Sequence, residues 1–317
     1  MTRKNFRLTA VAVAAALAAP GMASATDLTY FTTVFDTDFT TAGLGGMRFG
    51  DGTGSLTLAG VTGSVSKAYL YWHGPSNAGP DGNKDVSFAG TGISGTFLGI
   101  SSDNCWGFEN SIAYRADVTS LVSGDGAYAL AGFVKPDVEI NGVSLIVFFD
   151  DGDDTNNRDV VMFDGNDSNI DNAFDAPGWN ITLAGIDYTD GSAFAQFHVG
   201  DGQGFLDDAI TVNATELVPA GAVFQGDSVP SAGTGSPDTG GLLWDIKSFE
   251  VTSLLSPGLN TLEVSTGVFS DCLACMLIAI DLPAGAAPPP PPVPEPGSLA
   301  LLGLGLAGMG LARRRRA

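Results

Sequence analysis

Turn-forming residues interrupt this chain every 6 to 12 positions across residues 26–284, and no stretch in that range keeps an apolar period of 3.6. Short apolar runs separated in this way are typical of β-sandwiches, whereas an amphipathic helix needs the longer period. Two examples are the aromatic run over residues 67–72 and the apolar run over residues 142–149. The sequence therefore predicts an all-β body.

Three sequence blocks occur twice, in the same order, along this body. They are an aromatic strand, an acidic-Val-Thr-Ser-Leu segment and an apolar strand that ends in Asp. The copies are residues 68–73 and 193–198, 116–123 and 249–256, and 145–150 and 276–281. The offsets are 125, 133 and 131 residues, and small differences of this kind are what loop insertions produce.

The duplication predicts the domain organisation. A single sheet in each copy would leave one apolar face uncovered, whereas two packed sheets in about 130 residues fit a jelly-roll-like sandwich. We therefore expect two tandem jelly-roll-like β-sandwich repeats between a signal peptide and a C-terminal tail. The expected boundaries are 1–25 for the signal peptide, 26–165 and 166–283 for the repeats, 284–292 for an Ala/Pro-rich linker and 293–317 for the tail.

The first 25 residues have the order of a secretory signal peptide. Three basic residues precede an apolar run over residues 8–19, and Ala23 and Ala25 form a small-residue site of the kind that signal peptidase recognises. The apolar run is too short for a permanent membrane span. We therefore expect export, with cleavage after Ala25.

The C-terminal tail has three consecutive parts. A short motif is followed by an apolar run over residues 299–312 and then by four arginines. This run is shorter than the ~20 residues of a stable span, and basic residues directly after it would stay on the cytoplasmic side. We predict a short hydrophobic transmembrane helix that anchors the chain temporarily. The motif is Val293, Pro294, Glu295 and Pro296, and the basic cluster is Arg313, Arg314, Arg315 and Arg316.

This tail resembles the PEP-CTERM sorting signal that exosortase enzymes recognise in Gram-negative bacteria. The resemblance implies Pro294, Glu295 and Pro296 as recognition residues, with processing at or near them and transient anchoring in the inner membrane. It also implies a final location at the cell surface or in the extracellular, biofilm-associated matrix, where exopolysaccharide or other surface glycans are candidate partners. An ordinary single-helix C-terminal anchor is the alternative.

Removal of both ends makes the remaining chain more acidic. Seven of the 14 basic residues lie in the two ends, so 7 basic residues remain against 35 acidic ones, a net charge of −28. Such a surface repels phosphate groups, which argues against nucleic acids and anionic membranes as partners. It attracts divalent cations.

Two Asp-rich stretches offer the hard oxygen ligands that Ca²⁺ prefers. Neither stretch has the ligand spacing of an EF-hand, and a solvated acidic loop is the alternative that we favour. The candidate Ca²⁺ ligands are Asp150, Asp151, Asp153 and Asp154 in the first stretch, and Asp164, Asn166, Asp167 and Asp171 in the second.

Three cysteines allow one disulfide bond in an oxidising compartment. The alternatives are Cys105 with Cys272, Cys105 with Cys275, or Cys272 with Cys275. A structural bridge is expected rather than a zinc or redox site, because the C-x-x-C pair lacks a second ligand pair. Trp106 lies in a predicted loop and is the candidate for contact with a ligand.

We find no catalytic motif in the sequence. Gly-x-Ser-x-Gly, His-Glu-x-x-His and Walker loops do not occur. His73 and His198 fall at equivalent positions of the two repeats, and no nucleophile motif accompanies either. We therefore predict a non-enzymatic surface or matrix protein. A carbohydrate- or Ca²⁺-dependent adhesion module is the second hypothesis, and a hydrolase with a cryptic carboxylate pair is the third.

Several body segments resemble a functionally uncharacterised family of bacterial and archaeal extracellular β-sandwich proteins. The resemblance implies a fold and a surface setting, and it supplies no catalytic residue. The segments that carry it are residues 68–72, 116–119, 142–149 and 160–165.

Overall fold

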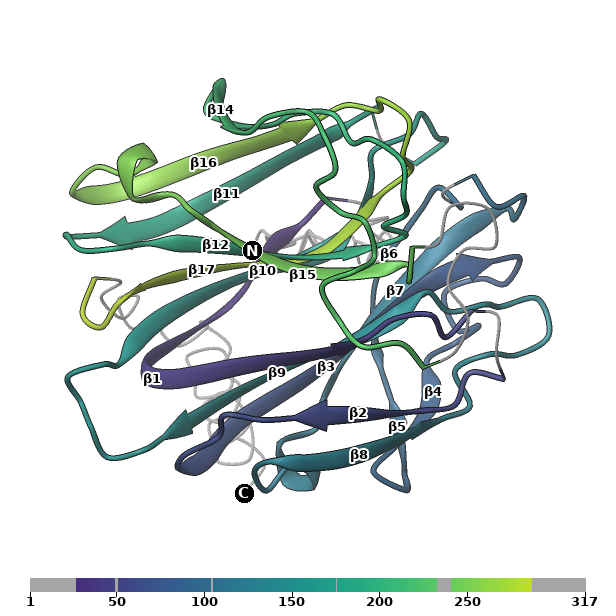
Figure 1. Cartoon of the computed structure of the whole chain (residues 1–317), viewed down its shortest axis with the longest axis horizontal. Helices are drawn as coiled ribbons and strands as arrows, with labels where there is room; N and C mark the ends of the chain where they lie inside the picture. The colour runs from purple at the N-terminus through teal and green to yellow at the C-terminus, as the bar shows by residue number, and fades with distance from the viewer. Residues whose placement is uncertain (1–26, 49–50, 104, 175, 233–240, 287–317) are drawn as a thin grey trace, which may run out of the picture.

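The computed structural model describes residues 27–48, 51–103, 105–174, 176–232 and 241–286. These residues form strands β1 to β17 and two short 3₁₀ turns, η1 and η2 (Figure 1), so the predicted all-β sandwich is confirmed. The predicted signal peptide, most of the linker and the whole sorting tail lie outside the described residues. Within the described ranges, no helix is long and apolar enough to cross a membrane.

The first unit of the body contains β1 to β9. Its elements are β1 (Thr29–Leu44), β2 (Gly54–Leu58), β3 (Ser64–Ser76), β4 (Asp85–Phe88), β5 (Thr91–Ser94), β6 (Thr96–Ser101), β7 (Asn110–Asp117), η1 (Thr119–Leu121), β8 (Gly126–Ala131) and β9 (Gly142–Asp150).

The second unit contains β10 to β17. Its elements are β10 (Arg158–Ser168), β11 (Trp179–Tyr188), β12 (Phe194–Gly200), β13 (Ile210–Val212), β14 (Thr215–Val218), β15 (Trp244–Glu250), η2 (Thr252–Leu254), β16 (Gly258–Thr266) and β17 (Ala274–Pro283).

The two units have the same strand order. In the first unit the inner sheet has the order β1-β9-β3-β7-β6 and the outer sheet the order β2-β8-β4-β5. In the second unit the inner sheet has the order β10-β17-β12-β15 and the outer sheet the order β11-β16-β13-β14. Both orders are those of a jelly roll, in which eight strands form two four-stranded sheets, and β6 is an extra edge strand. The predicted boundary between residues 165 and 166 lies inside β10, so the second unit begins at Arg158.

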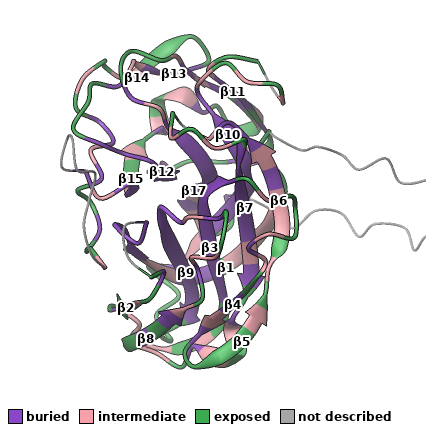
Figure 2. Cartoon of the chain, turned by 90° about the vertical axis from the view of Figure 1, so that its right-hand side faces the viewer, coloured by how far each residue is buried: buried purple, intermediate pink, exposed green. Residues whose placement is uncertain are grey.

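The inner sheets join through β1 into one nine-stranded sheet. The first part of β1 pairs with β10 as far as Thr37, and from Asp38 onward the strand pairs with β9. The halves of this sheet then face each other: Tyr71 and Phe148 of the first unit share an apolar cluster with Met162 of the second. The body therefore has four layers, with the inner strands buried in the middle (Figure 2).

Burial on both faces explains the sequence pattern of the inner strands. All residues of β9 except Asp150 are buried, and β10 is buried from Asp159 to Ser168. A strand that is buried on both faces has a continuous apolar sequence, whereas a strand with one solvent-exposed face alternates apolar and polar residues. The outer strand β11 shows this alternation over its first half.

The duplicated Val-Thr-Ser-Leu segments form the two 3₁₀ turns. In the first, the amide and hydroxyl of Thr119 both donate to Asp117, at 3.0 and 2.6 Å. In the second, the hydroxyl of Thr252 donates to Glu250 at 3.1 Å. The fully buried residue of each segment is the valine, whereas the leucine is only partly buried.

Candidate functional site

The interface between the inner sheets contains a buried ion pair. The carboxylate of Asp164 on β10 pairs with Arg115 and accepts a hydrogen bond of 3.0 Å from the hydroxyl of Tyr71. The Arg115 guanidinium lies 3.3 Å from the centroid of the Phe31 ring, so the cation also has an aromatic neighbour. Burial raises the pKa of Asp164, and the Arg115 charge opposes that shift. Asp164, a predicted Ca²⁺ ligand, instead joins the two units.

The other three predicted Ca²⁺ ligands of the second stretch, Asn166, Asp167 and Asp171, differ in contacts and burial. The amide nitrogen of Asn166 donates to the carbonyl and hydroxyl oxygens of Ser111, both at 3.2 Å. Asp167 is buried, whereas Asp171 is exposed.

In the first stretch, side chains accept hydrogen bonds from their own turn. The carboxylates of Asp150, Asp151 and Asp153 accept backbone N–H groups two residues further on, at 2.8, 2.9 and 3.0 Å, and Asp154 is exposed. Across the described part of the chain, no three His, Cys, Asp or Glu side chains are arranged to hold a metal ion. The fold thus does not bring the eight predicted ligands together as one coordination shell.

A disulfide bond joins the two units at one end of the sandwich. It connects Cys105, in the loop between β6 and β7, with Cys272, in the loop before β17. This is one of the three pairings that the sequence allowed. Cys275 is a free, buried thiol on β17, and burial raises its pKa well above the usual range. The C-x-x-C spacing therefore forms no local bridge.

Trp106, the predicted ligand contact, lies beside this disulfide and joins the two units. Its indole N–H donates to the carboxylate of Asp201 at 2.6 Å, and the Arg48 guanidinium lies 3.4 Å from its ring centroid. Arg48 also forms an ion pair with Glu139. One face and the polar edge of the indole are thus already occupied, so the structure assigns Trp106 to the contact between units.

Three carboxylates of the second unit hold the neighbouring loops. Asp207 accepts the N–H groups of Val223 and Phe224, at 2.9 and 2.7 Å. Asp271 accepts the N–H groups of Gln203, in the loop after β12, and of its neighbour Cys272. Asp245 accepts three backbone N–H groups of the loop before β15. Burial raises the pKa of Asp207 to about 6 and that of Asp271 to about 7. These three carboxylates therefore hold loop segments in place.

His73 and His198 occupy equivalent places on β3 and β12, as the repeat alignment indicates. Both side chains are fully buried, and burial lowers both pKa values to about 3, so the rings are neutral at ordinary pH. A Cβ at Gly200 would lie 2.9 Å from Nδ1 of His73, which shows how tightly this interface is packed.

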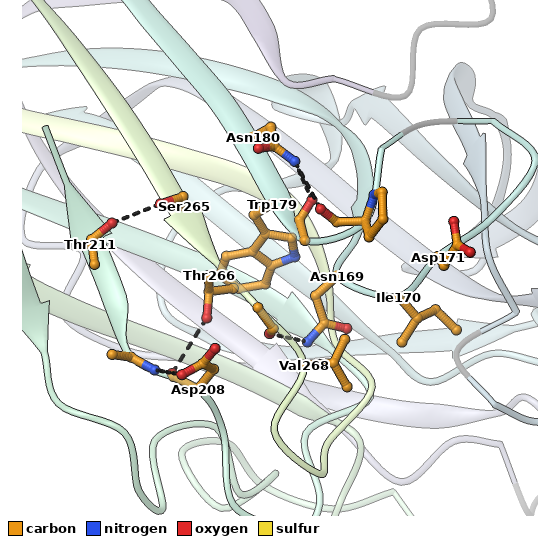
Figure 3. A pocket seen from close by; sticks show the side chains of 14 residues that line it. Asn169, Ile170, Asp171, Trp179, Asn180, Asp208, Thr211, Ser265, Thr266 and Val268 are labelled. Atoms are coloured by element: carbon orange, nitrogen blue, oxygen red, sulfur yellow. Dashed lines mark hydrogen bonds between the residues drawn. The ribbon is translucent and has the colours of Figure 1, made fainter. Parts of the chain in front are cut away.

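A surface depression with mixed polar and apolar walls lies in the second unit, and we call it the β11 pocket. It has a volume of about 700 Å³ and lies where β11 begins and β16 ends (Figure 3). Its apolar walls are Ile170, Pro177, Trp179 and Val268, and Asn169, Asp171, Asn180, Asp208, Thr211, Ser265 and Thr266 contribute polar groups. A second depression of about 480 Å³ shares Asn180, Thr211 and Ser265 with it and continues across the outer face of the sheet.

Local hydrogen bonds fix the walls of this pocket. The amide nitrogen of Asn180 donates to the carbonyl of Gly178 at 2.8 Å, and the hydroxyls of Thr211 and Ser265 lie 2.7 Å apart. The side chain of Asn169 donates to the carbonyl of Gly267 at 3.1 Å. Chain segments far apart in sequence therefore hold one another in place around the opening.

Four exposed apolar side chains lie on two neighbouring loops, one of which contributes Val268 to the β11 pocket. Hydrogen bonds of Ser270 to both backbone groups of Leu206 hold the two loops together. Isolated exposed apolar residues are ordinary, but neighbouring ones mark a contact surface. The four residues are Phe205, Leu206, Val268 and Phe269, with exposures of 38%, 48%, 46% and 64%.

Comparison with known proteins identifies the tail. Residues 292–316 match a family model described as the PEP-CTERM protein-sorting motif. The chain therefore carries a PEP-CTERM sorting signal, which implies an exported, surface-targeted protein that exosortase processes. No curated protein matches the chain. The matched residues lie outside the described structure and say nothing about the activity of the body.

Sequence reasoning did not find the β11 pocket. Trp179, Asn169 and Asp208 belong to no motif that the sequence indicated. The single available signal was Trp179 directly after a Pro-Gly turn at the start of an alternating strand. The partners that complete the pocket come from strands β13 and β16 and from three loops, so their proximity depends on the sheet order.

Proposed function

We propose that this chain is a non-catalytic protein of the cell surface or extracellular matrix of a Gram-negative bacterium. Its tail anchors it transiently in the inner membrane until exosortase processes it at or near Pro294 and Glu295. The observation that carries the proposal is the PEP-CTERM signal at residues 292–316.

The position of the chain exit supports a display role. The described chain leaves the body after β17 at Ala286, whereas the disulfide and the β11 pocket adjoin the loop before β17. Strand β17 has 10 residues, and a strand rises about 3.3 Å per residue, so the two ends lie roughly 30 Å apart. A body tethered by its tail would therefore present its disulfide-linked loops away from the membrane.

The chemistry of the buried acids supports a structural rather than a catalytic body. Asp164 pairs with Arg115 between the units, and Asp207, Asp245 and Asp271 accept backbone N–H groups from loops. A glycosidase needs two carboxyl groups that flank a substrate in a cleft. The buried carboxylates named here are instead committed to internal contacts.

The test is the fate of the tail in the native host. Pro294→Ala combined with Glu295→Ala should leave the full-length chain in the membrane fraction, because the recognition motif is lost, whereas wild-type chains appear as a shorter surface or medium form. Pro290→Ala, in the linker just before the motif, is the matched control and should be processed normally. Normal processing of the double variant, seen by immunoblot of cell fractions, would refute exosortase handling.

A binding role is the second candidate function. The specific observation that favours it is the β11 pocket, with exposed Val268 and Phe269 beside it. Such a surface would let a displayed protein contact the surrounding matrix.

A further inference from the structure

We propose that the β11 pocket binds a segment of a neutral polysaccharide. The proposal rests on the proposed function in one respect, namely that the exported protein meets the polysaccharide at the cell surface or in the matrix. Its own support is the chemistry of the pocket, which combines a buried donor, a polar wall and an apolar edge at Val268, the sequence neighbour of the exposed Phe269.

The first support is an unused hydrogen-bond donor in the floor of the pocket. Trp179 is fully buried, and its indole Nε1 has no acceptor within the described part of the chain. Figure 3 shows the nitrogen-bearing edge of this indole facing the side formed by Asn169 and Ile170. A buried donor without a partner destabilises the protein, so an acceptor delivered through the pocket has an energetic reason to bind there. A sugar hydroxyl is such an acceptor.

The second support is the polar wall. Asp208, Asn180 and the Thr211–Ser265 hydroxyl pair come from separate segments but line one depression. Carboxylate, amide and hydroxyl groups together can accept from and donate to the several hydroxyls of one sugar ring. The depression that continues along the sheet has further polar residues, Thr182 and Glu263. A surface of this length suits a polymer better than a single small molecule.

The third support is the apolar edge. Val268 lines the pocket and its neighbour Phe269 is 64% exposed. Sugar rings carry apolar C–H faces, and an exposed aromatic ring gives such a face a large contact area at low cost in side-chain entropy. An isolated acidic cavity would lack this edge.

Charge selects the class of polymer. The chain without its two ends has a net charge of −28, and Asp171 and Asp208 lie at the pocket itself. Like charge disfavours both a polyanionic polysaccharide and a second copy of this chain. A neutral polymer suffers no such repulsion.

The test uses the mature protein purified from its host, with the hexasaccharides of neutral glucan, mannan, galactan and xylan as probes and an alginate hexasaccharide as the anionic comparison. Titration calorimetry should give saturable binding of at least one neutral probe and none of alginate. Trp179→Phe keeps the ring but removes the donor, and should weaken binding about fivefold. Val268→Asp replaces an exposed side chain and should weaken binding of the neutral probe about tenfold or more.

Leu259→Asp is the matched control, because Leu259 is a 78% exposed apolar residue of β16 outside the pocket. It should leave binding unchanged, and melting temperatures should show that Val268→Asp and Leu259→Asp stay folded. The proposal is overturned if no neutral probe binds, if alginate binds more tightly, or if Val268→Asp binds like wild type. It is also overturned if sedimentation shows a dimer that Val268→Asp dissociates. Each of these results leaves tail-dependent sorting intact, so the two proposals fail separately.

Discussion

The indole N–H of Trp106 donates a hydrogen bond of 2.6 Å to the buried carboxylate of Asp201, across the boundary between the two jelly-roll units. Asp201 also accepts a hydrogen bond of 3.2 Å from the amide of Asn141, and its left-handed backbone, with φ of +75°, directs it into the interface. Burial raises the pKa of this carboxyl well above its usual range, with a smaller contribution from Asp271. The units thus form one body through specific polar contacts as well as apolar packing.

We expect Trp106→Phe to lower the free energy of unfolding by about 1–3 kcal/mol, because it leaves a buried acceptor with fewer donors. Urea unfolding monitored by fluorescence measures the change. In the Asp201→Ala background, which has no acceptor for the indole N–H, the same substitution should cost clearly less, since the two residues act as a pair. Equal costs in both backgrounds would show that the hydrogen bond does not couple the units.

We expect Cys272→Ser to lower the free energy of unfolding by about 2–5 kcal/mol, because the Cys105–Cys272 bond closes a loop with a sequence separation of 167 residues. Wild-type protein in reducing agent should behave like the variant. The control is Cys275, which should not react with a thiol reagent until the protein unfolds, because it is buried and its pKa is raised. Rapid labelling of Cys275 in the native protein would contradict this packing.

The loop carboxylates predict a pH dependence of stability. The pKa values of Asp207 and Asp271 are raised to about 6 and about 7, whereas an unfolded Asp titrates near 3.9. The native state therefore binds more protons than the unfolded state between about pH 4 and 7, so their contribution to stability falls as pH rises through this window. Above about pH 7 the contribution of these two carboxyl groups to stability no longer changes with pH. Melting temperatures across pH 4–8 measure the slope.

Asp207→Asn isolates one of these groups. The amide oxygen can still accept the N–H groups of Val223 and Phe224, and the new NH₂ takes the place of Oδ1, which has no partner among the described residues. We expect a shallower decline of the melting temperature between about pH 4 and 6. Asp153→Asn is the control, since hydrogen bonds from Thr155 lower the pKa of Asp153 and its titration lies below this window. An unchanged slope for Asp207→Asn would disprove the linkage.

The close approach of the two inner sheets predicts a cost for Gly142→Ala. An added Cβ would lie 2.6 Å from the carbonyl oxygen of Leu44 and 2.8 Å from Cβ of Trp244, and overpacking of this kind costs about 1–3 kcal/mol. Gly92→Ala on the outer strand β5 meets no atom within 4 Å and should change stability by less than about 0.5 kcal/mol. Denaturant unfolding of both variants compares them directly. An equally small loss of stability in Gly142→Ala and Gly92→Ala would contradict the four-layer packing.

Residues 142–149 and 160–163 were recognisable as strands because burial on both faces requires continuous apolar runs. The Asp-rich stretches were harder to interpret, because an Asp that binds a cation and an Asp that accepts backbone N–H groups have the same local sequence. Asp153 bonds to its own turn, whereas Asp164 pairs with Arg115, 49 residues away in sequence. Only the fold separates these roles.

The sequence by itself determined the all-β class, the duplicated strand pattern and the PEP-CTERM tail, because each depends on residues that are close together in the chain. Tertiary structure decided that β1 joins both inner sheets, that Cys105 pairs with Cys272, and that Trp106 holds an interface while Trp179 lines a pocket. Those outcomes depend on contacts between distant segments. Sheet order and the facing of two sheets create such contacts, and local patterns of hydrophobicity and charge do not encode them.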